Sequence, residues 1–186
     1  MTKGKSKMKK SNSIKNKIQN KLENNPVTSS TSTFTENLKK TSISELNAVL
    51  KGEYMAIDSY GKYIDNISDA NAKSELQKIQ KEHKTQAIAL SERVQNLGGS
   101  PTKNVGVLGK VAETISDITD MAKNKPSSYI KKALNGENQG IKLVDEMVKG
   151  DLDNDSKNLV NSMLNQDKSH VNTLSGLSTS LESTNK

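Results

Sequence analysis

The sequence contains no cysteine and no tryptophan, and its only two histidines are His83 and His170. Without cysteine the chain cannot form disulfides, thiolate zinc sites or a cysteine nucleophile. Aromatic residues are rare, with one phenylalanine and four tyrosines among 186 residues. This composition favours a helical bundle packed with Ile, Leu, Val, Ala and Met over a β-sandwich. No apolar run approaches the roughly 18 residues that a membrane-spanning helix needs.

The net charge of +7 is concentrated at the N-terminus. Residues 1–22 hold eight lysines and no acidic side chain, whereas the rest of the chain holds 20 basic and 21 acidic side chains. No apolar segment follows the lysines, so they are not a secretory signal, and we expect a cytoplasmic protein. We interpret residues 1–36 as a disordered basic tail and a Ser/Thr-rich linker. The tail itself is either a solvated arm or a weak contact with nucleic acid or an anionic surface.

Apolar residues recur with helical periodicity along four long segments, and no segment alternates with the period of a strand. The first segment begins near residue 41 at the capping-box pattern from Ser42 to Glu45. The second ends at the sequence GGSP, residues 98–101, because Gly and Pro terminate helices. The third opens at Pro126, and the fourth runs to about residue 179.

A shorter and weaker helical pattern covers residues 105–123, between the second and third segments. We therefore predict an all-α fold: a four-helix bundle made of two helical hairpins joined by a long crossover with a short extra helix. The bundle is predicted over residues 37–179, and residues 180–186 are predicted to be a frayed C-terminus.

The two predicted hairpins resemble each other. Residues 50–91 align with residues 134–175 without gaps and share nine identical residues, including the Gly-Glu pairs at 52–53 and 136–137. An internal duplication is our interpretation, and chance similarity between two helical hairpins is the alternative.

Each predicted helix has one gap in its apolar series, and an ionisable residue occupies every gap. Antiparallel packing should bring these residues to one level of the core. Burying unpaired charges costs several kcal/mol, and neighbouring carboxylates raise each other's pKa. A bound cation offsets both penalties, as in helical bundles that bind metal through one Glu from each of two helices and carboxylate-x-x-His pairs from the others. The candidate ligands are Glu53, His83, Glu137, Asp167 and His170.

The segments LKGEYMAIDSY, EHKTQAIALSERVQNLGGSP, IKKALNGENQGIKL and LNQDKSHVNTL resemble the ferritin-like superfamily of rubrerythrins and bacterioferritins. They are most similar to an uncharacterised bacterial ferritin-like family, a domain of unknown function. The resemblance covers roughly residues 42–178. It implies a four-helix bundle, whose relatives often hold two irons, and it includes homo-oligomers among the expected assemblies.

This sequence departs from a full di-iron pattern on its second helix. There His83 stands where the pattern has a carboxylate and Gln86 stands where it has a histidine. Glu82 is adjacent but lies about 100° from the predicted seam. Three carboxylates and two imidazoles suit Fe, Mn or Zn, and we expect one or two ions, with Fe first.

Two other interpretations stay open. In the first, the same residues form a metal-free polar layer in a structural or stress-associated scaffold, whose basic tail anchors it to an anionic partner. In the second, the protein is a DNA-protecting ferritin relative that uses the tail as a basic arm. The sequence assigns no catalytic residue, and stress response or metal handling is the expected setting.

Overall fold

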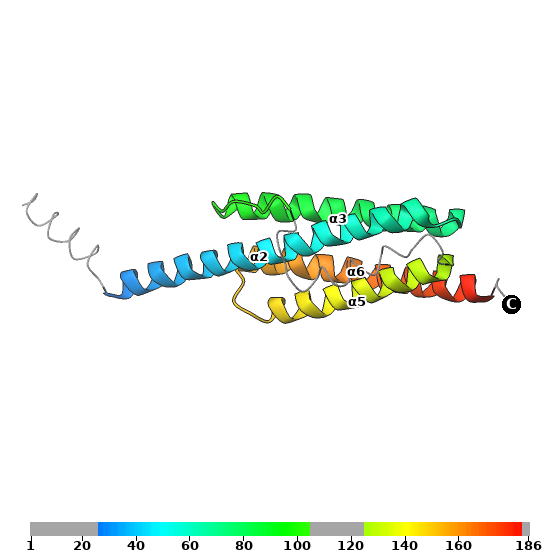
Figure 1. Ribbon diagram of the computed structural model, residues 1–186. Coiled ribbons are helices and arrows are strands. Elements are labelled where there is room, and N and C mark those ends of the chain that lie inside the picture. The colour runs from blue at the N-terminus through cyan, green and yellow to red at the C-terminus, as the bar shows by residue number, and fades with distance from the viewer. Residues whose placement is uncertain (1–25, 105–124, 184–186) are drawn as a thin grey trace, which may run out of the picture. The chain divides into compact units, whose positions relative to one another are not determined.

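The computed structural model describes residues 26–104 and 125–183 (Figure 1). Most of the predicted basic tail and the predicted crossover helix at residues 105–123 therefore lie outside the described residues. Within the described ranges the chain forms four α-helices and no strand, as the predicted all-α fold requires. They are α2 (Pro26–Asn66), α3 (Ala70–Asn96), α5 (Pro126–Val148) and α6 (Asn154–Ser183). None of these helices is long and apolar enough to cross a membrane.

The chain divides into two compact units, residues 1–40 and residues 41–186. The described part of the first unit, residues 26–40, is helical. This corrects the interpretation of residues 26–36 as a linker. Pro26 occupies the start of α2, where the N–H that proline lacks would have no helical partner. Thr35 Oγ1 donates a hydrogen bond to the carbonyl of Thr31 at 2.9 Å, so a hydroxyl is satisfied inside the helix instead of ending it.

Ser42 was predicted to cap the first helix, and this prediction is wrong because Ser42 lies inside α2. Ser42 is fully buried, and its Oγ accepts a hydrogen bond from the N–H of Asp153 at 2.9 Å. The carboxylate of Asp153 accepts from the N–H of Ser156 at 3.1 Å and pairs with Arg93. Ser42, whose surrounding sequence resembles the start of a helix, thus links α2 by a hydrogen bond to the turn before α6.

The other helix ends follow their sequence signals. Asp69 caps α3 by accepting from the N–H of Ala72 at 2.8 Å. Helix α3 ends at Asn96, and Gly98 adopts a positive φ of 74°, which favours glycine. Gly99 is also required, since a Cβ there would lie 2.8 Å from Ile43 Cγ2. At the C-terminus, residues 180–183 continue α6 instead of fraying.

Two apolar clusters fill the core of the second unit. The first consists of Tyr60, Tyr63, Ile67, Ala72, Leu76, Ile79, Tyr129, Ile130, Ala133, Leu174 and Leu177. The second consists of Leu46, Val49, Leu50, Ala87, Leu90, Val94, Val148, Leu152, Val160, Met163 and Leu164. Helices α2 and α6 run from the second cluster to the first, and α3 and α5 run the other way. Each hairpin is therefore antiparallel, and α5 begins beside the first cluster whereas α3 ends beside the second.

Candidate metal centre

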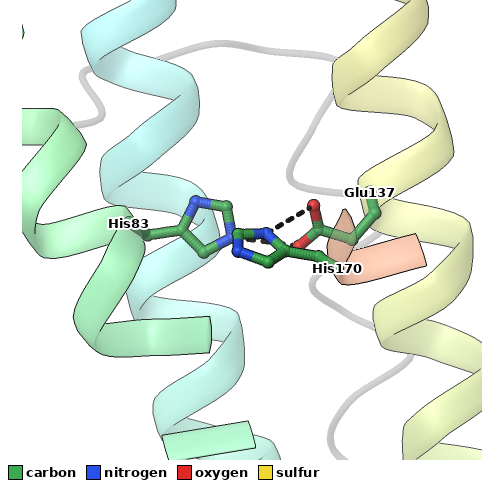
Figure 2. Close-up of side chains that lie close together, drawn as sticks. All are labelled: His83, Glu137 and His170. Atoms are coloured by element: carbon green, nitrogen blue, oxygen red, sulfur yellow. Dashed lines mark hydrogen bonds and ion pairs between the residues drawn. The ribbon is translucent and has the colours of Figure 1, made fainter. Parts of the chain in front are cut away.

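Five buried ionisable side chains lie between the two apolar clusters, and we call them the polar layer. They are Glu53 on α2, His83 on α3, Glu137 on α5, and Asp167 and His170 on α6. On every helix, the members of the polar layer lie between the residues that belong to the first cluster and the residues that belong to the second. Figure 2 shows His83, Glu137 and His170 converging from three helices. All five residues named from the sequence thus meet at one level of the bundle.

His83 lies between two carboxylates. Its Nδ1 is 2.8 Å from Glu53 Oε2, and its Nε2 is 2.9 Å from Glu137 Oε1. A carboxylate only accepts hydrogen bonds, so both contacts are satisfied together only by a doubly protonated imidazolium. Burial alone would lower the pKa of His83, but the hydrogen bonds to Glu137 and Glu53 outweigh it and raise the pKa to about 10.

Glu137 is the centre of the layer, because it contacts both histidines and a tyrosine. Its Oε2 lies 3.4 Å from His170 Nδ1, and its Oε1 accepts a hydrogen bond from the Tyr60 hydroxyl at 2.6 Å. Burial alone would raise the pKa of Glu137, but the hydrogen bonds from His170, His83 and Tyr60 lower it to about 2. Burial, together with the charge of Glu137, raises the pKa of Tyr60. Glu137 is therefore ionised at neutral pH, while Tyr60 keeps its proton.

His170 also has a carboxylate on each side. Its Nε2 lies 2.5 Å from Glu82 Oε2, while its Nδ1 faces Glu137 and lies 3.7 Å from Asp167 Oδ1. Burial alone would lower the pKa of His170, but the hydrogen bonds to Glu137 and Glu82 raise it. Asp167 accepts a hydrogen bond from Gln86 Nε2 at 3.0 Å, and burial raises the pKa of Asp167 to about 6.

The sequence places Glu82 off the predicted seam and Gln86 outside the five candidate ligands, and Tyr60 is not among those candidates. In the structure each of them hydrogen-bonds a member of the polar layer. A single apolar seam describes one face of a helix, but a helix in a four-helix bundle faces two neighbours. Glu82 reaches α6 on the second of these faces. The sequence does contain one signal for this contact. Glu82 and His83 are adjacent, so their side chains point toward two different neighbours of α3.

Gly52 and Gly136 directly precede the two glutamates. A Cβ at either position would meet nothing within 4 Å, so packing against a neighbouring helix does not require glycine there.

The donor atoms of the polar layer fit one metal ion. One ligand atom each from His83, Glu137 and His170 lies within 4.8 Å of the other two, and all three residues are buried. Each imidazole also places its second nitrogen on a carboxylate, Glu53 or Glu82. Such outer carboxylates orient metal-binding histidines and raise their basicity. Two metals fit less well, because on α3 the Gln86 amide replaces the second histidine of the di-iron pattern.

Residues 41–150 match the family described as "Domain of unknown function (DUF2383)". The match includes Glu53, His83 and Glu137 but ends before α6, which carries Asp167 and His170. No protein of curated function matches the sequence.

Several solved structures share the fold. The bacterioferritin-related thioferritin of Bacteroides fragilis, described as dodecameric, has 19% identity, a TM-score of 0.62, and coverage of 79% of this chain and 89% of that chain. The bacterioferritin of Rhodobacter capsulatus has 23% identity, a TM-score of 0.59, and coverage of 76% and 85%. A two-domain protein of Anabaena variabilis, with DJ-1/ThiJ/PfpI-like and ferritin-like domains, has 18% identity, a TM-score of 0.62 and 76% coverage of this chain. The chain spans only 37% of that protein's length. These similarities confirm the ferritin-like four-helix bundle, and with the family match they confirm the predicted resemblance.

Proposed function

The chain belongs to the family Domain of unknown function (DUF2383), and from its polar layer we propose that it binds one transition-metal ion. The observation that carries the proposal is the pairing of each histidine. Each imidazole points one nitrogen at Glu137 and holds the other on a second carboxylate. This is the arrangement in which a histidine ligates a metal through one nitrogen and is oriented through the other.

In the proposed site, His83 Nε2, His170 Nδ1 and the carboxylate of Glu137 are the ligands. Asp167 Oδ1 lies 3.7 Å from His170 Nδ1 but is not part of this group of three. Glu53 and Glu82 then hold the two histidines through their remaining N–H groups. This moves Glu53 from the ligand set expected from the sequence to a supporting position. Two imidazoles with one carboxylate are the donors that non-haem Fe(II) sites use, and Mn and Zn accept the same atoms.

Iron is the first metal to test. The similar solved structures include the Rhodobacter capsulatus bacterioferritin, described with a metal-free dinuclear site and haem iron. That iron is haem iron, so the support for non-haem iron in this chain is the donor set of two imidazoles and one carboxylate. The Gln86 amide on α3 supports one ion rather than two. When bound, the ion would supply Lewis-acid and redox chemistry inside the bundle.

A second interpretation rests on His83, whose two nitrogens both contact carboxylates. A protonated His83 satisfies Glu53 and Glu137 without a metal, and the layer is then a structural ion-pair network. Such a layer fixes the register of the helices at a cost in stability relative to apolar packing. It predicts a folded protein that retains no metal.

Elemental analysis of the full-length, untagged protein distinguishes these interpretations. The protein is loaded anaerobically with Fe(II), passed through a desalting column and compared with Glu137→Gln. Glu146→Gln is the matched control, because Glu146 is an exposed carboxylate on the same helix. We expect about one Fe per chain in the wild type and the control, and a loss of at least about tenfold in Glu137→Gln. Equal, negligible metal in all three folded proteins would refute metal binding.

We also propose that the chain self-associates, because the similar Bacteroides fragilis protein is described as dodecameric. Light scattering coupled to size-exclusion chromatography measures the assembly directly. A strictly monomeric mass at micromolar concentration would refute this part of the proposal.

A further inference from the structure

A pocket between α3 and α6 lies next to the polar layer. It has a volume of about 260 Å³, space for several water molecules. Its lining consists of Glu82, Thr85, Gln86, Ala89, Leu159, Ser162, Met163 and Gln166. Two of these side chains contact the layer itself. Glu82 Oε2 is hydrogen-bonded to His170 Nε2, and Gln86 Nε2 donates to Asp167 Oδ1. A ligand in the pocket is therefore separated from the layer by a single side chain.

Two acceptor oxygens of residues that line the pocket lack donors within the described ranges. Gln86 is only 8% exposed, and its buried Oε1 has no hydrogen-bond partner among the described residues. A buried acceptor without a partner has lost its hydrogen bonds to water and gained none in return, which is unfavourable. Turning the amide over would not help, because Oε1 would then face the carboxylate of Asp167. Both hydrogen bonds of Glu82, to His170 and to Gln166, fall on its Oε2. Its Oε1 has no such bond within the part of the chain that the structure describes.

Charge and access point to the same class of ligand. Glu82 is the only charged residue that lines the pocket. Its side chain is 44% exposed, whereas the side chain of His170 behind it is 3% exposed. A pocket whose described lining has one carboxylate and no basic side chain favours a cation over an anion. Carbonyl and carboxylate oxygens are ligands that a divalent cation accepts while it still carries part of its water shell.

We propose that the pocket between α3 and α6 is the access site through which a divalent metal ion reaches the polar layer. Glu82, whose side chain is 44% exposed, is the first ligand that the ion meets, and the buried Gln86 Oε1 is the next. This inference rests on the proposed function, because it supplies the route to the same layer. The ion exchanges water for the oxygens of Glu82 and Gln86 and then passes inward to the histidines. In this proposal the exposed side of the Glu82 carboxylate binds the incoming ion, while its Oε2 keeps the hydrogen bond with the buried His170.

A second pocket on the bundle provides a comparison. It lies between α2 and α3, has a larger volume of about 360 Å³, and is lined by Tyr54, Ile57, Lys84, Ala87, Ile88, Ser91 and Glu92. Lys84 and Glu92 give it one charge of each sign, and no hydrogen bond links its lining to the polar layer in the described residues. Access through this pocket is not expected, although it is the larger of the two.

Two adjacent residues on α3 line different pockets. Ala89 lines the access pocket, and Ile88, which is 61% exposed, lines the other one. The test mixes the metal-free full-length protein with Co²⁺ in a stopped-flow instrument and follows the visible absorption of the bound ion. We expect Ala89→Trp to slow binding by about tenfold or more with the final amplitude unchanged. Ile88→Trp should stay within about twofold of the wild-type rate.

The outcomes separate the two proposals. If the wild type binds Co²⁺ and Ala89→Trp binds it at the same rate, or if both variants are slowed equally, the access site is wrong and the metal site stands. If the folded wild type binds no Co²⁺, both proposals fail. Should Ala89→Trp not fold, Ser162→Trp on the opposite wall replaces it, with Ser169→Trp as its control at another exposed position of α6.

The charge of Glu82 gives an independent readout. In the wild type, the binding rate should fall as ionic strength rises, because salt screens the attraction between the pocket and the cation. Glu82→Gln keeps the shape of the side chain and can still accept a hydrogen bond from His170, but it should lose most of this salt dependence. An equally steep salt dependence in Glu82→Gln would overturn the role of Glu82 as the first ligand.

Discussion

His83 should make the metal-free protein less stable at alkaline pH. Its pKa in the folded protein is raised from 6.5 to about 10, because Glu137 and Glu53 stabilise the imidazolium more than burial disfavours it. A raised folded-state pKa stabilises the fold fully below the unfolded pKa near 6.5, and this stabilisation is lost as the pH rises through 10. Between these limits His83 itself holds one more proton in the folded state than in the unfolded state.

The size of the effect follows from that proton. Each pH unit within the window should lower the free energy of unfolding by about 1.4 kcal/mol. Over the interval from pH 7.5 to pH 9, where lysine and exposed tyrosine titrate little, the loss is about 2 kcal/mol. The measurement is urea unfolding of the full-length protein in EDTA, followed by circular dichroism at several pH values across this interval.

His83→Gln is the reference, since it removes the titrating ring and keeps a polar side chain. The variant should be less stable than the wild type at pH 7.5, because two buried carboxylates lose their cation. The difference in free energy between the two proteins should shrink by about 2 kcal/mol by pH 9. A difference that stays constant with pH would refute the assignment of an imidazolium to His83. NMR titration of the two histidine rings in the wild type checks the same pKa without any variant.

Two further predictions concern stability at neutral pH, and urea unfolding measures both. Gly52→Ala and Gly136→Ala should each stabilise the fold by about 0.5–1 kcal/mol, because glycine is a poor helix former and a Cβ there meets nothing within 4 Å. Gly99→Ala should destabilise the fold, since its Cβ would collide with Ile43. Equal effects at all three glycines would contradict this distinction between open and crowded positions. Tyr60→Phe should destabilise the fold by about 1.5–3 kcal/mol, because it removes a buried hydrogen bond to an ionised carboxylate. An unchanged free energy of unfolding would mean that the hydrogen bond from Tyr60 does not stabilise Glu137.

The positions of the polar layer could be predicted from the sequence because buried positions recur with the helical period. Glu53 and Glu137 interrupt apolar series with helical spacing, so a side chain at those positions must face the core whatever its chemistry. The end of α3 could be predicted for a similarly local reason, since Gly98 needs a positive φ. Both inferences depend only on residues within one helix or one turn.

Other features depended on partners that a single helix does not reveal. Ser42 carries a strong local signal for a helix start, but its hydroxyl accepts from Asp153, which is 111 residues away in sequence. Glu82 reaches His170 across the face that α3 shares with α6, 88 residues away. Such contacts follow from the side-by-side placement of helices that are distant in sequence.

The metal site and the metal-free layer exclude each other at Nε2 of His83, which lies 2.9 Å from Glu137 Oε1. That nitrogen either carries a proton, which it donates to Glu137, or offers its lone pair to a metal ion, and it cannot do both. The same carboxylates that favour a metal cation also favour the proton, and they raise the pKa of His83 to about 10. A metal ion must therefore displace a proton that is bound tightly at neutral pH, so its affinity should rise with pH up to about 10. The replacement of a carboxylate by histidine on α3 thus places a built-in cation inside the layer. Under the proposed function, the pH and the concentration of free metal decide whether a proton or a metal ion occupies the layer.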